Sequence, residues 1–351
     1  MPSRELNSIQ ALSCTVQRNC DISDAQFAGD YTLCTYLLKM KEYYRWSNGL
    51  GFDVTPKRED VGDWVEKREQ LWDTLERGSY TPVVIDGDDY DAFDNDGINE
   101  ALNERALVYS AGTGRLGKPH FFLGKLLNVE QLEGYRLLVS GEEYARDLTA
   151  PPAMARGRLI FVRRDALRRL LWESVEESSW FKREGALHRA MRCYNFTDNP
   201  RAALERMTEN ELESVIMHEI GEVVAGDLLG DGWHAMLSTV SNTRAEIVVR
   251  AVRDHLADCL SSLPALLTAE NIPSLHFYFA NLGAMRREIF PALYDAYQRW
   301  TETRNLQALK RAVRQGKDHW LAVGARIVEF HATYGDDCPP RIESYVAGKH
   351  L

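Results

Sequence analysis

The chain has 351 residues, of which 44% are hydrophobic and 27% are charged, so it has the composition of a folded globular protein. Its 52 acidic residues outnumber its 42 lysines and arginines, and the formal net charge is −10. A field of that sign repels phosphate backbones and anionic lipid, and no apolar run reaches the ~18 residues of a bilayer-spanning helix, so neither general nucleic-acid binding nor a membrane location is expected.

The first part of the chain predicts a mixture of helices and strands. Residues 21–47 carry apolar groups at helical spacing, and a second helix is expected over 58–77. Strands are expected at 80–86, 104–111 and 157–162, and a hairpin around 127–134. This alternation indicates a small mixed α/β region at the N-terminus.

From Asp165 onward the pattern is nearly all helical. Helices are expected over 165–194, 208–229, 243–262, 284–302, 305–314 and 317–334. The segment "TAPPAMARG" is the best candidate for a linker. We therefore expect an α+β protein with an N-terminal domain over 1–155 and a helical domain over 156–351.

The cysteines and the N-terminus bear on the location of the protein. The six cysteines are scattered and form no C-x-x-C pair, which is typical of reduced thiols. Residues 1–20 hold no positive segment followed by an apolar one, so no export signal is expected. A cytoplasmic protein is the prediction.

A glycine-rich segment, "GTGRLGK" at 112–118, fits the spacing of a phosphate-binding loop. Pro119 stands where that loop needs a hydroxyl for Mg²⁺, and the residues after it look extended, so a glycine-rich turn is favoured. Arg115, Lys118 and His120 are then candidates for a lip that binds an anionic substrate.

An acidic segment, "DGDDYDAFDNDGINE" at 86–100, invites comparison with a calcium loop. If Gly97 is placed at the sixth position, Ala92 and Asn103 fall on the first and last ligand positions, and neither supplies a carboxylate. A solvated loop in which Asp96 caps the following helix is therefore the expectation.

The segment "ESVIMHEIGEVVAGD" at 213–227 is the main candidate for a site. On a helix, His218 and Glu222 lie one turn apart on one side, and the apolar residues take the other side. Gly221 costs about 1 kcal/mol relative to Ala in mid-helix, so its presence predicts that another backbone approaches there. We expect a buried polar seam.

Two metal-binding patterns come close to this segment. The zinc motif H-E-x-x-H needs a second histidine where Glu222 stands. The helical di-iron arrangement needs two Glu-x-x-His pairs, whereas His255 and Asp258 run in the reverse order.

A third pattern involves more of the chain. "VIMHEIGEVV" resembles the "LLHDIGK" stretch of the HD-domain superfamily, whose members are all-helical, metal-dependent phosphohydrolases with an H…HD…D ligand set. The resemblance covers 183–263 and implies His218 and Glu219 as the doublet, with His188 of "REGALHRAMRCY" upstream and Asp258 of "HLADCLSSL" downstream.

The segment departs from that superfamily at two positions. Glu219 stands where the doublet has Asp, and Glu222 replaces a Lys. The change makes the expected site more acidic, which suits a cation better than an anionic substrate. The superfamily also includes mixed-valent di-iron oxygenases, so the resemblance leaves the reaction class open.

The function expected first is a metal-dependent hydrolase, with a phosphoester of a small molecule as one substrate class. A divalent ion (Mn, Fe, Zn or Ni) would activate water. The expected ligands are His188, His218, Glu219 and Asp258, with His255 as an alternate ligand and with Glu219 and Glu222 as catalytic residues.

Two alternatives remain open on the same residues. One is a non-haem iron enzyme that activates O₂. The other is a non-enzymatic helical binding or assembly protein in which "HEIGE" is a polar seam between helices or subunits, and a homo-oligomer is compatible with it. "LCTYLLKMKEYYRW", "GRLGKPHFFLGKLL" and "RMTENELESVIMHEIGE" also resemble an uncharacterised family of bacterial proteins of similar length, which implies no particular activity.

Overall fold

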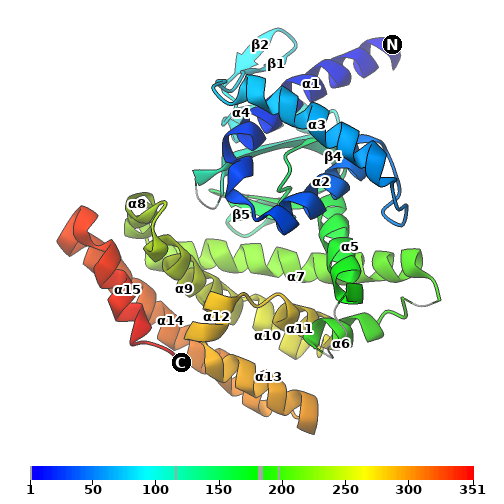
Figure 1. Ribbon diagram of the computed structural model, residues 1–351. Helices are drawn as coiled ribbons and strands as arrows, with labels where there is room; N and C mark the ends of the chain where they lie inside the picture. Colours follow the sequence, from blue (N-terminus) through cyan, green and yellow to red (C-terminus); the bar gives the residue numbers. More distant parts are fainter. Residues whose placement is uncertain (1, 115–116, 181–184, 197) are drawn as a thin grey trace. The chain divides into compact units, whose positions relative to one another are not determined.

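The computed structural model describes residues 2–114, 117–180, 185–196 and 198–351. The chain divides into two units, Met1–Glu176 and Glu177–Leu351, called here the N-terminal unit and the C-terminal unit. Every strand among the described residues lies in the N-terminal unit, and the described part of the C-terminal unit is built from helices (Figure 1). This arrangement confirms the expected α+β class.

The helices of the N-terminal unit are α1 (Pro2–Phe27), η1 (Ala28–Asp30), α2 (Leu33–Ser47), α3 (Arg58–Leu75), α4 (Asn95–Asn103) and most of α5 (Arg164–Trp180). The helix expected over 21–47 is therefore interrupted. Thr32 caps α2 by accepting a hydrogen bond from the Thr35 backbone N–H, and this cap begins a new helix where the periodicity alone suggested continuity. The helix expected over 58–77 is confirmed by α3.

The strands are β1 (Val83–Ile85), β2 (Asp88–Tyr90), β3 (Leu107–Thr113), β4 (Pro119–Leu132), β5 (Tyr135–Arg146), β6 (Ala153–Arg156) and β7 (Leu159–Arg163). The first two strands form a small antiparallel pair, and the others form a sheet in the order β3–β4–β5–β7–β6. β5 and β7 are parallel, and the remaining neighbours are antiparallel. The expected hairpin is confirmed, because β4 and β5 pair up to Leu132 and Tyr135.

The large sheet carries buried apolar side chains on both faces. Phe121 and Leu123 join Val16 of α1 in one buried cluster, whereas Phe122 and Phe161 belong to a second cluster. Successive residues of a strand point to opposite faces, so Phe121 and Phe122 serve different clusters. The segment expected as a linker, 149–157, contains β6. This strand pairs with β7 and forms one edge of the large sheet.

The helix that begins in the acidic segment is capped two residues earlier than expected. Asp94 accepts a hydrogen bond from the Gly97 backbone N–H at 2.9 Å and so caps α4, whereas Asp96 lies in the first turn of that helix. The expectation that Asp96 provides the cap was wrong. Its carboxylate still suits this position, because the N-terminal end of a helix favours negative charge.

The helices of the C-terminal unit after the end of α5 are α6 (Ala186–Arg192), α7 (Pro200–Leu229), α8 (Asp231–Val240), α9 (Arg244–Leu260), α10 (Ser262–Thr268), α11 (Ile272–Ala280), α12 (Ala284–Ile289), α13 (Pro291–Thr303), α14 (Gln307–Tyr334), η3 (Gly335–Asp337) and α15 (Pro339–Ala347). The helix expected over 284–302 divides at Pro291, which begins α13. The two helices expected around residue 316 are one, because Gly316 lies inside α14. A Cβ there would come within 2.7 Å of the Phe290 ring.

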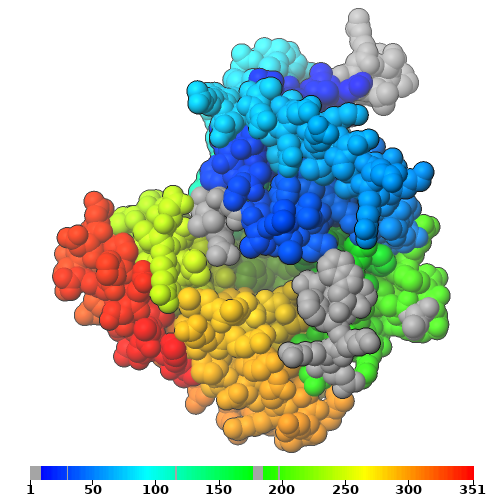
Figure 2. Space-filling model, viewed as in Figure 1, coloured from blue at the N-terminus to red at the C-terminus, as the bar shows by residue number. Residues whose placement is uncertain are grey.

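One continuous core fills the C-terminal unit. It contains buried side chains of α7, α8, α9, α13, α14 and α15, among them Trp233, Trp300 and Trp320. Figure 2 shows α12 and α13 in gold and orange and α15 in red on the visible face of this unit. None of the described helices has the length and apolar character needed to cross a bilayer.

Candidate functional site

The segment that the sequence singles out lies in the second half of α7. Asn199 caps this helix by accepting a hydrogen bond from the Ala202 backbone N–H at 3.1 Å, and the helix ends before Gly230, which has a φ of 75°. His218 Nε2 and Glu222 Oε1 lie 3.6 Å apart on one face of the helix. The predicted polar stripe is therefore confirmed.

Helix α9 crosses α7 at this face, and the backbones of the two helices approach each other closely there. A Cβ atom on Gly221 would lie 2.4 Å from the backbone oxygen of Ala257, so only glycine fits at this crossing. The expectation that another backbone approaches Gly221 is confirmed. The crossing also brings Asp258 of α9 next to His218 of α7.

Asp258 is the centre of a cluster that joins several helices. His218 Nδ1 lies 2.7 Å from its Oδ1, and the Ser262 hydroxyl donates to the same oxygen at 2.8 Å. The Tyr278 hydroxyl donates to Oδ2 at 2.9 Å, and the Arg286 guanidinium donates to Oδ2 as well. Both carboxylate oxygens are therefore engaged, and the side chain is only 2% exposed.

Glu222 is the second charged partner of His218. Arg253 Nη2 donates to its Oε1 at 2.5 Å, and the same guanidinium lies 3.6 Å from Asp254. Glu219 is the neighbouring acid on α7 and is buried. We call His218, Glu222, Arg253, Asp258 and Arg286 the ionic network.

The histidine and the central aspartate of the ionic network stabilise each other's charged forms. Burial opposes a charged imidazole, but Asp258 and Glu222 outweigh it and hold the pKa of His218 well above 6.5. Burial likewise opposes the ionised Asp258, but Arg286 and His218 outweigh it and hold the pKa of that carboxyl below its usual range. Each member of this pair therefore favours the charged form of the other.

The two glutamates of "HEIGE" have opposite protonation states. Burial would raise the pKa of Glu222, but Arg253 and His218 lower it to about 2. Burial and the charge of Glu222 together raise the pKa of Glu219 to about 8. At neutral pH, then, Glu222 carries a charge and Glu219 does not.

The two other histidines expected as ligands lie elsewhere. The His255 ring stacks on Trp320 with the centroids 5.3 Å apart, and its Nε2 pairs with the Arg286 backbone oxygen at 2.8 Å. Burial, with the nearby Arg286 charge, lowers the pKa of His255 to about 3, so it is a neutral core histidine. His188 is half-buried on α6, which packs against α11, and none of the bonds described for the ionic network involves it.

Three of the residues expected as metal ligands, His218, Glu219 and Asp258, are gathered at this site. Both oxygens of the Asp258 carboxylate are bonded to other side chains. Within the described ranges, no group of three or more histidine, cysteine, aspartate or glutamate side chains is arranged to hold a metal. Two guanidinium groups, from Arg253 and Arg286, supply the positive charge instead.

The expected anion-binding lip belongs to the N-terminal unit. Arg115 lies outside the described residues. Lys118 is buried, and its Nζ lies 2.7 Å from Asp24 Oδ1. His120 is buried with Nδ1 3.2 Å from Asp147 Oδ2. Both side chains therefore face internal acids.

Sequence reasoning missed four residues of this site: Arg253, which pairs with Glu222, and Ser262, Tyr278 and Arg286, which bond to Asp258. They lie on α9, α10, α11 and α12, and nothing in their local spacing links them to "HEIGE". The sequence offered one indication of the arginine partners. A buried acid needs a cationic partner, and the arginines of neighbouring amphipathic helices are the candidates.

In the part of the chain that the structure describes, one unit contains a mixed sheet, and the other is built from helices and carries the ionic network. The chain belongs to the family of unknown function DUF6866: residues 11–163 match the model of its N-terminal domain and residues 168–349 that of its C-terminal domain. Searches of the curated proteins and of the solved structures gave no match. The resemblance to an uncharacterised family is thereby confirmed, and the resemblance to the HD-domain superfamily receives no support.

Proposed function

We propose that this chain is a non-enzymatic binding or assembly protein and that its C-terminal unit is a helical scaffold held by the ionic network. One observation carries the proposal. The Arg286 guanidinium donates to the carboxylate of Asp258, the residue that the sequence offered as a metal ligand. Of the functions expected from the sequence, this one requires no rearrangement of the site.

The charges of the ionic network support this choice. Its cations are His218, Arg253 and Arg286, and its ionised acids are Glu222 and Asp258. A divalent ion that approached Asp258 would meet like charges on both sides and would have to displace the half-buried guanidinium of Arg286. Removing one partner of a buried ion pair costs several kcal/mol, because the other charge then lacks a partner.

The network has a structural consequence for the scaffold. Asp258 on α9 is bonded to α7, α10, α11 and α12 through His218, Ser262, Tyr278 and Arg286. Such directional bonds define how the helices are positioned, whereas apolar contacts tolerate sliding. The scaffold would thus present fixed helix faces to a partner or to a second copy of the chain.

The test is a thermal unfolding series of the full chain with Mn²⁺, Fe²⁺, Zn²⁺ or Ni²⁺ added, beside a chelator control. A metal that binds only the folded protein raises the midpoint, so we expect no rise. His218→Ala is the matched variant and should lower the midpoint in every condition. A rise that occurs in the wild type and is lost in His218→Ala would instead support the metal-dependent hydrolase or the O₂-activating enzyme.

A further inference from the structure

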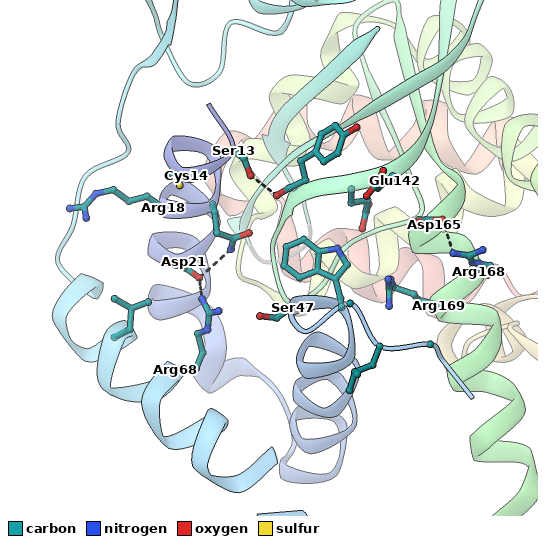
Figure 3. A pocket seen from close by; sticks show the side chains of 18 of the residues that line it. Ser13, Cys14, Arg18, Asp21, Ser47, Arg68, Glu142, Asp165, Arg168 and Arg169 are labelled. Carbon is teal, nitrogen blue, oxygen red and sulfur yellow. Dashed lines mark hydrogen bonds and ion pairs between the residues drawn. The ribbon is translucent and has the colours of Figure 1, made fainter. Parts of the chain in front are cut away.

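A large pocket opens in the N-terminal unit, and no residue of the ionic network lines it. Its volume is about 750 Å³, which lies within the range of small-molecule sites. Figure 3 shows Cys14 and Asp21 on one side, from α1, and Asp165 and Arg169 on the other, from α5. Ser47, at the end of α2, lies between the two walls.

The charged side chains of the pocket wall are balanced. Among the described residues that line it are four arginines and four acids: Arg18, Arg68, Arg168, Arg169, Asp21, Glu142, Glu143 and Asp165. Half of these charged side chains pair with one another. Arg68 lies 2.7 Å from Asp21, and Arg168 lies 3.0 Å from Asp165.

Two further lining residues are compensated by partners behind the wall. Arg169 Nη1 donates to Glu42 at 2.7 Å, and Glu143 lies 2.5 Å from Arg163. The wall therefore offers N–H donors and carboxylate acceptors side by side, with little net field.

The polar groups of one wall are held in place by a web of hydrogen bonds. Gln17 Nε2 donates to the Tyr43 hydroxyl at 2.6 Å and to the Arg146 backbone oxygen at 3.1 Å, and its Oε1 accepts from the Arg146 backbone N–H at 3.2 Å. Asp21 also accepts from Trp72 Nε1 at 3.4 Å. The donors and acceptors are thus positioned before any ligand arrives, which lowers the entropic cost of binding.

An aromatic ring and aliphatic side chains complete the lining. Trp46 is half-buried and stacks on Tyr43 with the centroids 5.5 Å apart, so its ring is held in a fixed plane. Leu71 and Leu75 of α3 line the pocket as well. A ligand that fills the pocket therefore needs an apolar surface beside its polar groups.

We infer that this pocket binds a neutral, polyhydroxylated small molecule of the size of a mono- or disaccharide. A hydroxyl group both donates and accepts, so it pairs equally well with a guanidinium and with the carboxylate beside it. The C–H faces of a sugar ring pack on a tryptophan such as Trp46. This inference is independent of the ionic network, which lies in the other unit.

Charged ligands match this wall less well. An anion that approached Arg68 or Arg168 would compete with Asp21 or Asp165 for the same guanidinium, and a cation would compete with the arginines. Breaking such a pair leaves one charge without its partner. A neutral ligand bonds to the N–H and oxygen positions that remain and leaves each pair intact.

The experiment uses Cys14 as a reporter, because its thiol is exposed and lines the pocket. The full chain reacts with a maleimide, and mass spectrometry follows each cysteine separately. Probes are a panel of neutral mono- and disaccharides, with inorganic phosphate and glycine as charged comparisons. Cys34 and Cys193 are exposed thiols outside the pocket and serve as internal controls.

We expect one or more of the saccharides to slow the modification of Cys14 by about tenfold at ten times its Kd, with Cys34 and Cys193 unaffected. Phosphate and glycine should have no effect on any of the three. Protection of Cys14 by phosphate or glycine alone would overturn the assignment of a neutral ligand. Absence of protection by every saccharide would overturn it as well.

A pair of variants then locates the binding. Cys14→Trp places a bulky ring in the pocket and should abolish the calorimetric binding signal of the protecting saccharide. Ala11→Trp adds the same ring at an exposed position of α1 that does not line the pocket, and should leave binding unchanged. Ser47→Trp repeats the test from α2 if Cys14→Trp does not fold. Undiminished binding in a folded pocket variant would contradict the inference.

Discussion

Arg286 of α12 and Asp258 of α9 form an ion pair, in which the guanidinium of the half-buried Arg286 donates to the buried Asp258 carboxylate. This ion pair sets the balance of charge around Asp258. It places a fixed positive charge beside the aspartate that the sequence offered as a metal ligand, and Tyr278 closes the arrangement by pairing with both groups at 2.9 and 3.0 Å.

Replacing Arg286 should destabilise the protein much more than replacing its neighbour. Arg286→Met leaves Asp258 buried without its main cation, so we expect a loss of roughly 3 kcal/mol in the free energy of unfolding. Arg287 is exposed and contributes a cation–π contact to Tyr294 at 4.4 Å, so Arg287→Met should cost less than about 1 kcal/mol. Urea denaturation of both variants makes the comparison, and equal losses would contradict this view of the network.

The two glycines within α7 should respond in opposite directions to alanine. At Gly221 an added Cβ would lie 2.4 Å from the Ala257 backbone oxygen, so Gly221→Ala should force α7 and α9 apart and cost about 2 kcal/mol or more. At Gly226 nothing lies within 4 Å of the added atom, so Gly226→Ala should gain up to about 1 kcal/mol from helix propensity. Thermal unfolding of both variants decides the matter. A Gly221→Ala protein as stable as the wild type would show that the helices do not meet there.

The stability of the protein should fall as pH rises toward 8, and Glu219 should account for part of that fall. Its pKa is about 8 in the folded protein and near 4.5 when unfolded, so between these values the folded state holds one more proton. The contribution is lost at up to roughly 1.4 kcal/mol per pH unit. His218 adds a fall in the same direction above pH 6.5, because its pKa is raised.

Glu219→Gln isolates the contribution of this carboxyl. The amide is neutral at every pH, so the free energy of unfolding of the variant should decline less steeply than that of the wild type between about pH 5 and 8. Urea denaturation at several pH values gives the two slopes. Parallel curves would mean that Glu219 titrates normally.

Lys118 should be essential for the stability of the N-terminal unit, because it is buried against Asp24 at 2.7 Å. Lys118→Met leaves a buried carboxylate without its cation, and we expect a loss of roughly 3 kcal/mol. Lys125 is exposed on β4, and Lys125→Met should change stability by less than about 0.5 kcal/mol. Urea denaturation compares the two. A small loss in Lys118→Met, with the lysine instead required for retention of an added anion, would favour the substrate-binding role expected from the sequence.

Local periodicity was sufficient to predict much of the fold. The helical spacing of 213–227 places His218 and Glu222 on one face, and the mid-helix Gly221 indicates a close neighbouring backbone, which is that of α9. The hairpin of β4 and β5 was equally local. Such features depend on residues within a few positions of one another, and that is the range over which sequence patterns carry structural information.

The partners of the charged residues were beyond that range. Arg286 is 28 positions from Asp258, and Lys118 is 94 positions from Asp24. Whether a histidine or an acid binds a metal, pairs with an arginine or stacks in a core depends on which helices meet. His255 and Asp258 are close in sequence on one helix, yet the first stacks on Trp320 and the second holds the ionic network.

The most direct test of the central claim is elemental analysis of the full chain, purified without a histidine tag, with His218→Ala beside the wild type. The ionic network predicts that neither protein retains Mn, Fe, Zn or Ni in stoichiometric amount after incubation with these ions and gel filtration, and that His218→Ala is the less stable of the two. Stoichiometric metal in the wild type that is lost in His218→Ala would contradict the claim and identify "HEIGE" as part of a metal site.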